Sequence, residues 1–273
     1  NAKRYDERIL LKLNDVYLKL SLQELSLRIN TQNSKIGIDK NLINLKNIDI
    51  NLNLIKFFKN QNSIEKVKII TDENKIKNIT NLLNSYKLNI ASSIIYSQIS
   101  EGEIKEIKNI NFDKKYENKF FYEINGDVKN ANLNLIGLGN LNKINFEFNI
   151  KEKKYDLKNI LFKYQNINFY SKKVSITKLK KDFEVEGDLN NKKGLININP
   201  LLKLSNLNLD ILNENKVLIE TENDFAFRIK SNLLIEDLKL KSKTKFDEIF
   251  TNEKYQNLIY FKSGEMYAQY TNK

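Results

Sequence analysis

The chain has 273 residues and a formal net charge of +12, and it contains no Cys and no His. Without Cys it can form no disulfide, and without Cys and His it lacks the commonest metal ligands and the commonest general base at neutral pH. Because no uninterrupted apolar stretch approaches about 18 residues, we expect no transmembrane helix within the chain.

The positive charge has two interpretations. It favours an anionic partner such as nucleic acid or lipid head groups. However, the chain is also rich in Lys, Asn and Ile, which A/T-rich codons encode, and its basic residues are spread along the whole sequence. This spread favours the compositional explanation. The chain starts at Asn1 with charged neighbours, so we expect no signal peptide here and a chain that was cut from a longer protein.

The first 30 residues predict a short helix that leads into a strand. Apolar side chains fall at helical spacing at Ile9, Leu10, Leu13 and Tyr17. Over Leu18–Ile29 apolar and polar residues alternate, which predicts a β-strand with one apolar face. The alternation slips at Gln23 and Glu24, as it does at a β-bulge.

Residues 30–90 predict further strands and a helix. The polar stretch from Asn30 to Ser34 is typical of a turn, and alternating strands follow over Ile36–Ile55, with a break near Lys40, and over Ile64–Ile70. From Asp72 to Tyr86 the apolar residues change to helical spacing, and Asp72 is a suitable N-cap.

From Gly102 the alternation resumes and predicts a long series of strands. These cover Ile104–Phe112, Lys119–Asn125, Val128–Ile136, Ile144–Ile150, Leu157–Tyr164, Ile167–Leu179, Phe183–Leu189, Leu195–Ile198, Leu202–Leu212, Val217–Ile219, Phe225–Ile229 and Leu233–Leu240. The only proline, Pro200, predicts a turn or a strand edge. Lys245–Tyr255 is predicted as a second helix and Leu258–Phe261 as a short last strand.

Two sequence patterns recur. Tyr122 begins YEINGDVKN and Phe183 begins FEVEGDLNN, and in each the Gly-Asp pair is predicted to form a turn at a strand end. In addition, LKNIDI begins at Leu45, IKNINF at Ile107 and LKNILF at Leu157. Such repeats indicate an elongated array of hairpins, each of which packs mainly on its neighbours.

The sequence offers little for catalysis. Its densest carboxylate cluster is Glu101, Glu103 and Glu106. On a strand Glu101 and Glu103 would share one face, as a general acid–base pair or a cation site requires, but a solvated turn beside Gly102 is the favoured explanation. No P-loop, dinucleotide fingerprint, Gly-x-Ser-x-Gly elbow or His-Glu-x-x-His motif is present. We therefore predict a protein that is not an enzyme, with no catalytic residue, cofactor or metal site.

What covers the apolar face of the strands decides the function. A second sheet would make a sandwich, closure would make a barrel, and lipid tails would lie in an open groove. Many predicted strands exceed the usual ~5–6 residues, and the predicted helices are too few to cover them. We therefore predict an all-β, mainly antiparallel fold over residues 1–273. It is one elongated, twisted and curled sheet that forms a hydrophobic groove, with an N-terminal part at 5–90 and a hairpin part at 98–273.

Several segments carry a resemblance to a known family. In the N-terminal part they are LKLSLQELSLRI after a short helix, LKNIDINLNL, IEKVKII and the helix NKIKNITNLLNSY, and in the middle they are YEINGDVKNANLNL, LNKINFEFNI, LKNILFKY and FEVEGDL. On these segments, which lie between residues 5 and 200, the chain resembles the AsmA-like family of Gram-negative bacteria (TamB/YhdP type), which is related to the chorein-type bridge lipid transfer proteins of eukaryotes.

The resemblance implies a periplasmic body that is tethered to the inner membrane by an anchor outside this chain. It further implies a hydrophobic groove that carries phospholipid acyl chains toward the outer membrane, with outer-membrane assembly proteins as partners and no nucleic acid. We expect the groove to be lined by Leu20, Leu22, Leu27, Ile29, Ile48, Ile50, Leu52, Leu133, Leu135, Phe146, Phe148 and Ile150. The alternatives are a structural or adhesive β-domain with a closed core and no lipid, and a basic nucleic-acid-binding β-protein.

Overall fold

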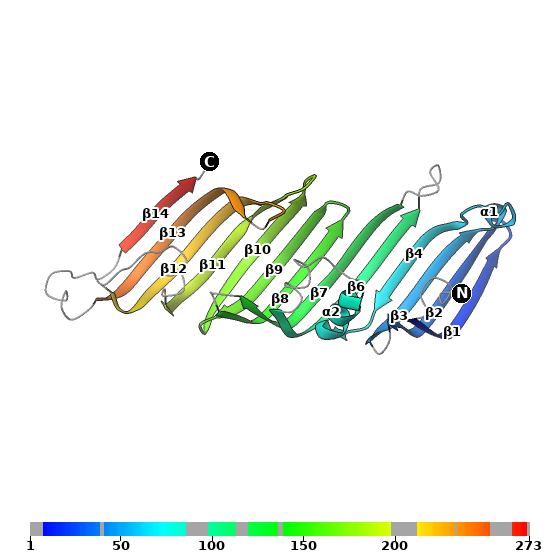
Figure 1. Ribbon diagram of the computed structural model, residues 1–273, viewed down its shortest axis with the longest axis horizontal. Coiled ribbons are helices and arrows are strands. Elements are labelled where there is room, and N and C mark those ends of the chain that lie inside the picture. The colour runs from blue at the N-terminus through cyan, green and yellow to red at the C-terminus, as the bar shows by residue number, and fades with distance from the viewer. Residues whose placement is uncertain are drawn as a thin grey trace. The chain divides into compact units, whose positions relative to one another are not determined.

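The computed structural model describes residues 8–38, 41–85, 98–112, 120–135, 139–197, 212–232, 234–251 and 264–271. In these ranges the alternating sequence forms an all-β fold (Figure 1). Thirteen strands follow the hydrogen-bonded order β1-β2-β3-β4-β6-β7-β8-β9-β10-β11-β12-β13-β14 of one antiparallel sheet, and the two-residue β5 pairs with β6 beside this path. Among the described residues β1 and β14 do not pair, so the sheet is not closed.

The chain divides into two compact units, residues 1–131 with 147–152, and residues 132–146 with 153–273. The first unit contains β1 (Ile9–Ser21), β2 (Ser26–Ile38), β3 (Asn41–Asn53), β4 (Ile64–Thr71), β5 (Asn74–Lys75) and β6 (Ile99–Phe112). The second contains β9 (Lys154–Tyr164), β10 (Ile167–Lys178), β11 (Phe183–Asn197), β12 (Leu212–Ile229), β13 (Ile235–Thr251) and β14 (Gly264–Thr271). Two strands, β7 (Phe120–Leu135) and β8 (Gly139–Lys151), contribute residues to both units.

Two short helices accompany the strands of the first unit. Helix α1 (Leu54–Phe58) follows β3 directly, and the side chain of its N-cap residue Asn53 accepts a hydrogen bond from the Lys56 N–H at 3.1 Å. Helix α2 (Ile76–Ser85) confirms the predicted change to helical spacing, although it begins after Asp72. It packs against β2, β3 and β6 with Ile76 and Thr80 buried, and Figure 1 shows it at one end of these strands.

The predicted N-terminal helix is wrong over Ile9–Tyr17, because these residues lie in β1 and pair with β2. Asp15 has a positive φ of 47°, and the apolar residues on its two sides, Leu13 and Val16, are therefore three positions apart instead of two. This single shift within an alternating strand imitates helical spacing. Residues 1–7 lie outside the described ranges.

Other local predictions need correction. Gln23 and Glu24 form part of the turn between β1 and β2 rather than a bulge, and Asn30–Ser34 lies inside β2 rather than in a turn. Residues 245–251, predicted as helix, belong to β13, where pairing with β12, although interrupted by two register shifts, provides backbone partners. The remainder of that predicted helix, Pro200 and the predicted strand 258–261 lie outside the described residues.

The two Gly-Asp pairs lie within strands and make no turns. A Cβ on Gly126 in β7 would overlap the Lys105 carbonyl oxygen and lie 2.5 Å from the Phe148 ring, and a Cβ on Gly187 in β11 would lie 3.1 Å from the Phe225 ring. Each glycine thus leaves room for a phenylalanine of another strand, and this ring covers the backbone where the glycine has no side chain. The sequence repeat is therefore also a repeat of packing.

Among the described residues, six strands contain a non-glycine residue with positive φ away from their first and last positions: Asp15, Asn33, Asn130, Lys143, Asn159 and Asp237. In β6, Gly102 also has a positive φ, of 120°. In β2, Thr31 and Ser34 lie on either side of Asn33, and their hydroxyl oxygens are 2.7 Å apart, so residues three positions apart share one face here. Left-handed φ values of this kind occur at β-bulges, which bend a strand and increase its twist.

Candidate functional site

The apolar side chains of the first unit form cross-strand rows, because residues paired across an antiparallel ladder share a face. One row joins Leu20, Leu27, Leu52 and Ile64, a second joins Leu18, Ile29, Ile50, Val67 and Ile110, and a third joins Val16, Thr31, Ile48 and Ile69. The neighbouring row on the opposite face is polar and joins Tyr17, Asn30, Asp49, Lys68 and Asn109. Six of the predicted lining residues therefore lie together on one face: Leu20, Leu27, Ile29, Ile48, Ile50 and Leu52.

Only one end of this face is covered by another described element. Ile38, Ile43 and Leu45 are buried, with 1%, 7% and 3% of their surface exposed, on β2 and β3 where α2 packs. The members of the first two rows on β2, β3 and β4 are only half-buried, and on the edge strand β1 Leu18 remains 67% exposed. The aliphatic rows therefore present continuous surface that the described protein leaves open.

The third row contains a charge at its end. Lys108 of β6 pairs with Ile69, and its ammonium nitrogen forms an ion pair of 2.8 Å with the Glu106 carboxylate. Glu106 accompanies Lys108 on the same side of the strand, two positions away. The apolar face thus changes from aliphatic to ionic at this point of β6.

The other predicted lining residues have varied positions. Leu22 lies in the β1–β2 turn, outside the rows, and is 73% exposed. In β8 of the first unit Phe148 is buried beside Gly126 and Ile150 is half-buried. Leu133 and Phe146 are half-buried residues of the second unit, and the side chain of Leu135 lies outside the described ranges.

The second unit interrupts its apolar face with polar residues. Val185, Phe225 and Leu240 share this face with the row Asn191–Thr221–Thr244 and with Asn223 and Ser242. The Thr221 hydroxyl donates to Asn191 Oδ1 at 2.5 Å, Asn223 Nδ2 donates to Thr221 Oγ1 at 2.9 Å, and the Ser242 hydroxyl donates to Asn223 Oδ1 at 2.7 Å. We call these five residues (Asn191, Thr221, Asn223, Ser242 and Thr244) the polar belt. Their mutual bonds satisfy groups that would be costly to bury unpaired.

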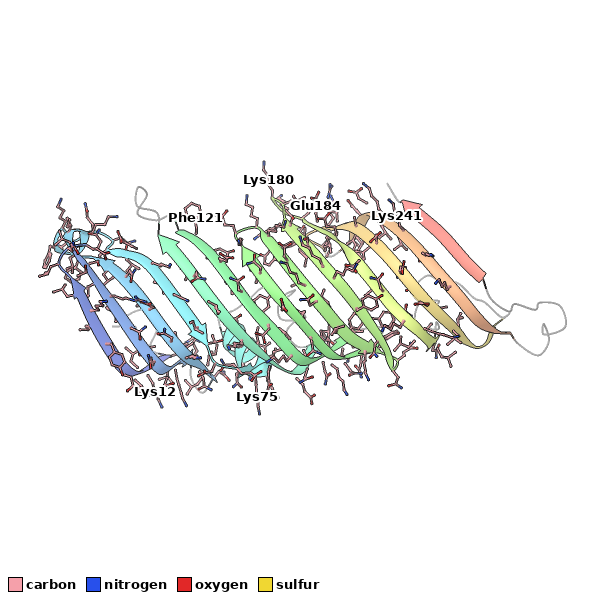
Figure 2. All side chains as sticks on the ribbon, turned by 180° about the vertical axis from the view of Figure 1, so that it is seen from behind. Lys12, Lys75, Phe121, Lys180, Glu184 and Lys241 are labelled. Atoms are coloured by element: carbon pink, nitrogen blue, oxygen red, sulfur yellow. The ribbon has the colours of Figure 1, made fainter. Side chains whose placement is uncertain are left out.

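The opposite face of the second unit is charged and hollowed. Acidic residues alternate along β12 at Glu220, Glu222 and Asp224, directly opposite Lys245, Lys243 and Lys241 of β13, the last of which Figure 2 labels. A hollow of about 760 Å³ is lined by Tyr170, Lys172, Asp188, Asn190, Glu222, Asn223, Asp224, Lys241, Ser242 and Lys243. Apart from Asn223 and Ser242 of the polar belt, its lining residues lie on the face opposite the apolar side chains, and most of them are charged.

Asp188 stabilises an irregularity of β10 beside this hollow. Its carboxylate accepts hydrogen bonds from the backbone N–H groups of Lys172 and Lys173 at 3.0 Å each, from the Ser171 hydroxyl and from Asn190. Burial alone would raise the pKa of Asp188, but these hydrogen bonds outweigh it and lower the pKa below its usual value. Nearby, the pKa of Asp156 is lowered in the same way, because hydrogen bonds from Ser175 and Lys173 outweigh the effect of burial.

The carboxylate cluster singled out in the sequence lies within β6 and not in a turn, so the favoured explanation is wrong, and lysines lie beside it. Glu101 and Glu103 line a hollow of about 430 Å³ together with Lys75, Lys77, Gly102 and Asn130, and Lys75 pairs directly with Glu103 across the β5–β6 ladder. The ranges that the structure describes contain no group of three or more acidic, His or Cys side chains arranged to hold a metal ion. They also contain no helix that is both long and apolar enough to cross a bilayer.

Comparison with protein-family models, with curated proteins and with solved structures found no match to this chain.

Sequence reasoning missed two features of these faces. The polar belt is visible in the strings TENDF (Thr221–Phe225) and KSKT (Lys241–Thr244), where Thr, Asn and Ser occupy the positions at which the alternation requires apolar residues. Helix α1 was expected to continue a strand, because LNLI alternates up to Ile55, but the Asn53 cap and the pair Phe57-Phe58 end the alternation.

Proposed function

We propose that the apolar face of the strands binds phospholipid acyl chains, and that the protein is a non-catalytic segment of a lipid-transfer conduit. In this proposal the acyl chains lie across the rows of Leu and Ile, and the head groups remain in water. The observation that carries it is the set of aliphatic rows over β1–β4, half-buried on β2–β4 and exposed on β1, for which the described residues offer only α2 as cover. The resemblance to AsmA-like proteins would place this activity in the periplasm, with the membrane anchor outside this chain.

The energetics of such a site are non-directional. Covering apolar surface contributes roughly 25 cal/mol per Å², or about 0.8 kcal/mol for each buried CH₂ group, whatever the side chain that provides it. No single Leu or Ile should therefore be essential. A charge placed within a row should act differently, because an acyl chain cannot solvate it.

The polar belt favours a second candidate for the other unit. Hydroxyl and amide groups that bond to one another are typical of a packed protein interior, and Asn191 is 2% exposed. This arrangement supports a structural β-domain with a closed core in the second unit. We therefore assign the lipid-binding role first to the rows of the first unit.

A direct test is mass spectrometry of the full chain after purification without detergent. We expect phospholipid to co-purify in a defined ratio to protein. Protein that carries no lipid, and that takes up none from vesicles containing a photoreactive acyl chain, would support the closed-core alternative instead.

Two adjacent residues of β3 provide a matched pair of variants. Ile50 lies in the second aliphatic row, whereas Asn51 lies on the opposite face beside Arg28 and Lys66. We expect Ile50→Asp to reduce bound lipid several-fold and Asn51→Asp to leave it unchanged, while both keep the β-sheet circular dichroism spectrum. Equal lipid content in the two folded variants would contradict binding on this face.

A further inference from the structure

Five large apolar side chains gather outside the rows, at one end of the strands of the first unit. Leu22 and Leu25 belong to the β1–β2 turn, and Ile55, Phe57 and Phe58 belong to α1. Their exposed fractions are 73%, 43%, 46%, 55% and 78% in this order. We call these five residues the apolar tip. Single exposed apolar side chains are common on protein surfaces, but a cluster of this kind marks an interaction site.

Backbone hydrogen bonds hold the two segments of the apolar tip together. The Leu54 N–H, at the start of α1, donates to the Leu25 carbonyl oxygen at 2.8 Å. The Phe57 and Phe58 rings contact edge to face, with centroids 5.8 Å apart and planes at 76°. Figure 1 shows α1 beside the turn that joins β1 and β2. The fold therefore holds these apolar side chains together at positions that are exposed to water.

The charged residues around the apolar tip are mostly basic. Lys56 and Lys59 flank the two phenylalanines in sequence, and Lys19 and Lys66 lie in one cross-strand row close to the same strand ends. Two carboxylates belong to the same region. Glu24 accepts a hydrogen bond from the Ser26 hydroxyl, and Glu65 accepts one from the Asn53 amide. The surroundings of the tip are thus positive.

We propose that the apolar tip inserts into the interface of a bilayer that contains anionic phospholipid. Leu, Ile and Phe side chains enter the boundary between head groups and acyl chains, and adjacent lysines contact lipid phosphates. Positive charge around exposed aromatic residues complements an anionic lipid surface. This inference concerns residues outside the aliphatic rows and does not require lipid to lie in those rows.

The absence of Trp from the sequence provides a direct readout. Phe58→Trp introduces the only tryptophan of the chain into the tip, and Leu234→Trp places one at a similarly exposed site, 59% exposed, in the second unit. We expect the emission of the Phe58→Trp protein to shift to the blue with vesicles of phosphatidylglycerol and phosphatidylcholine. The Leu234→Trp emission should not shift.

Vesicle flotation measures the same interaction by affinity. Replacing both phenylalanines, in Phe57→Ser/Phe58→Ser, should weaken binding by about 10-fold or more, whereas the control Leu234→Ser/Ile235→Ser should leave it unchanged. Lys56→Glu/Lys59→Glu should weaken binding to phosphatidylglycerol vesicles by about fivefold for each lysine lost, and should have little effect on pure phosphatidylcholine vesicles.

Two results would overturn this inference. One is an unshifted Phe58→Trp spectrum together with equal flotation of the wild-type and Phe57→Ser/Phe58→Ser proteins. The other is a wild-type dimer, detected by light scattering, that the same double variant converts to a monomer without a change in vesicle binding, since the tip would then be a protein interface. Lipid content by mass spectrometry reports on the aliphatic rows separately, so either proposal can fail without the other.

Discussion

The two units of the chain share the alternation of apolar and polar residues, but the faces that it forms differ in chemistry. In the first unit the apolar face of β1–β4 is almost wholly aliphatic, and the described residues cover its rows only in part. In the second unit the apolar face also contains the polar belt, and the opposite, charged face contains the hollow of about 760 Å³. A period of two therefore fixes which side chains share a face, but the chemistry of that face depends on what each position carries. This difference is the reason why we propose a non-directional apolar ligand for the first unit and a packed, hydrogen-bonded interior for the second.

The largest effect should come from the two strand glycines, one in each unit. Gly126→Ala in the first unit should lower the free energy of unfolding by about 2–4 kcal/mol, because its Cβ would meet a backbone oxygen and the Phe148 ring. Gly187→Ala should cost less, since its nearest contact is the Lys173 carbonyl oxygen at 2.8 Å. Urea unfolding followed by circular dichroism measures both.

A control strengthens the glycine comparison. The loss caused by Gly126→Ala should be smaller when it is measured in a Phe148→Ala background, because the ring that the new methyl group meets is absent there. Equal losses at the two glycines, or no coupling between Gly126 and Phe148, would show that the close approaches do not determine the cost.

A smaller effect should follow from cutting the polar belt. Asn223→Leu removes one of the two side-chain partners of the Ser242 hydroxyl, the other being Thr244 Oγ1, and the side-chain donor to the Leu189 carbonyl oxygen, which should cost about 1–3 kcal/mol. The exposed Asn168→Leu serves as the control and should be nearly neutral. If Asn223→Leu were neutral as well, the belt would not be a packed interior, and the contrast between the units would weaken.

The smallest effect concerns pH. The pKa of Asp188 is lowered in the folded protein, so its carboxylate stabilises the fold above the unfolded pKa of about 3.9, and this contribution is lost as the pH falls through the folded value. Asp188→Asn should therefore cost less than about 1 kcal/mol at pH 7, given its exposure to solvent, and the difference from wild type should shrink below about pH 4.

Glu123 is the corresponding test in the first unit. Hydrogen bonds from Asn149, at 2.8 Å, and from Lys151 lower its pKa, so Glu123→Gln should show the same sign of pH dependence. Unfolding midpoints measured between pH 3 and pH 7 would decide the sign for both residues. A variant that lost more stability at acid pH than at neutral pH would contradict this account of the carboxylates.

The sequence predicts the class of this fold and the face of most strand residues, because alternation is a local signal that pairing preserves. Ile29, Ile50 and Leu52 share a face as the pattern requires. The sequence does not predict helix α1, strand β1 or the location of Gly126 and Gly187 inside strands, since these depend on pairing partners distant in the chain. Leu22 lies outside the cross-strand rows for a related reason, as the hairpin turn begins one residue before the alternation ends.

The positive-φ residues within the strands have a consequence for how the chain tolerates insertions and deletions. At a β-bulge, one extra residue separates two side chains that share a face, so that they lie three positions apart instead of two. Deleting Asn33 together with this irregularity would leave Thr31 and Ser34 two positions apart, so that Ser34, Ile36 and the buried Ile38 would keep their face. Deleting a residue from a regular stretch of β2 would instead move the side chains on one side of the deletion to the opposite face. A bulge position such as Asn33 therefore tolerates a one-residue deletion in phase better than a regular stretch of strand does.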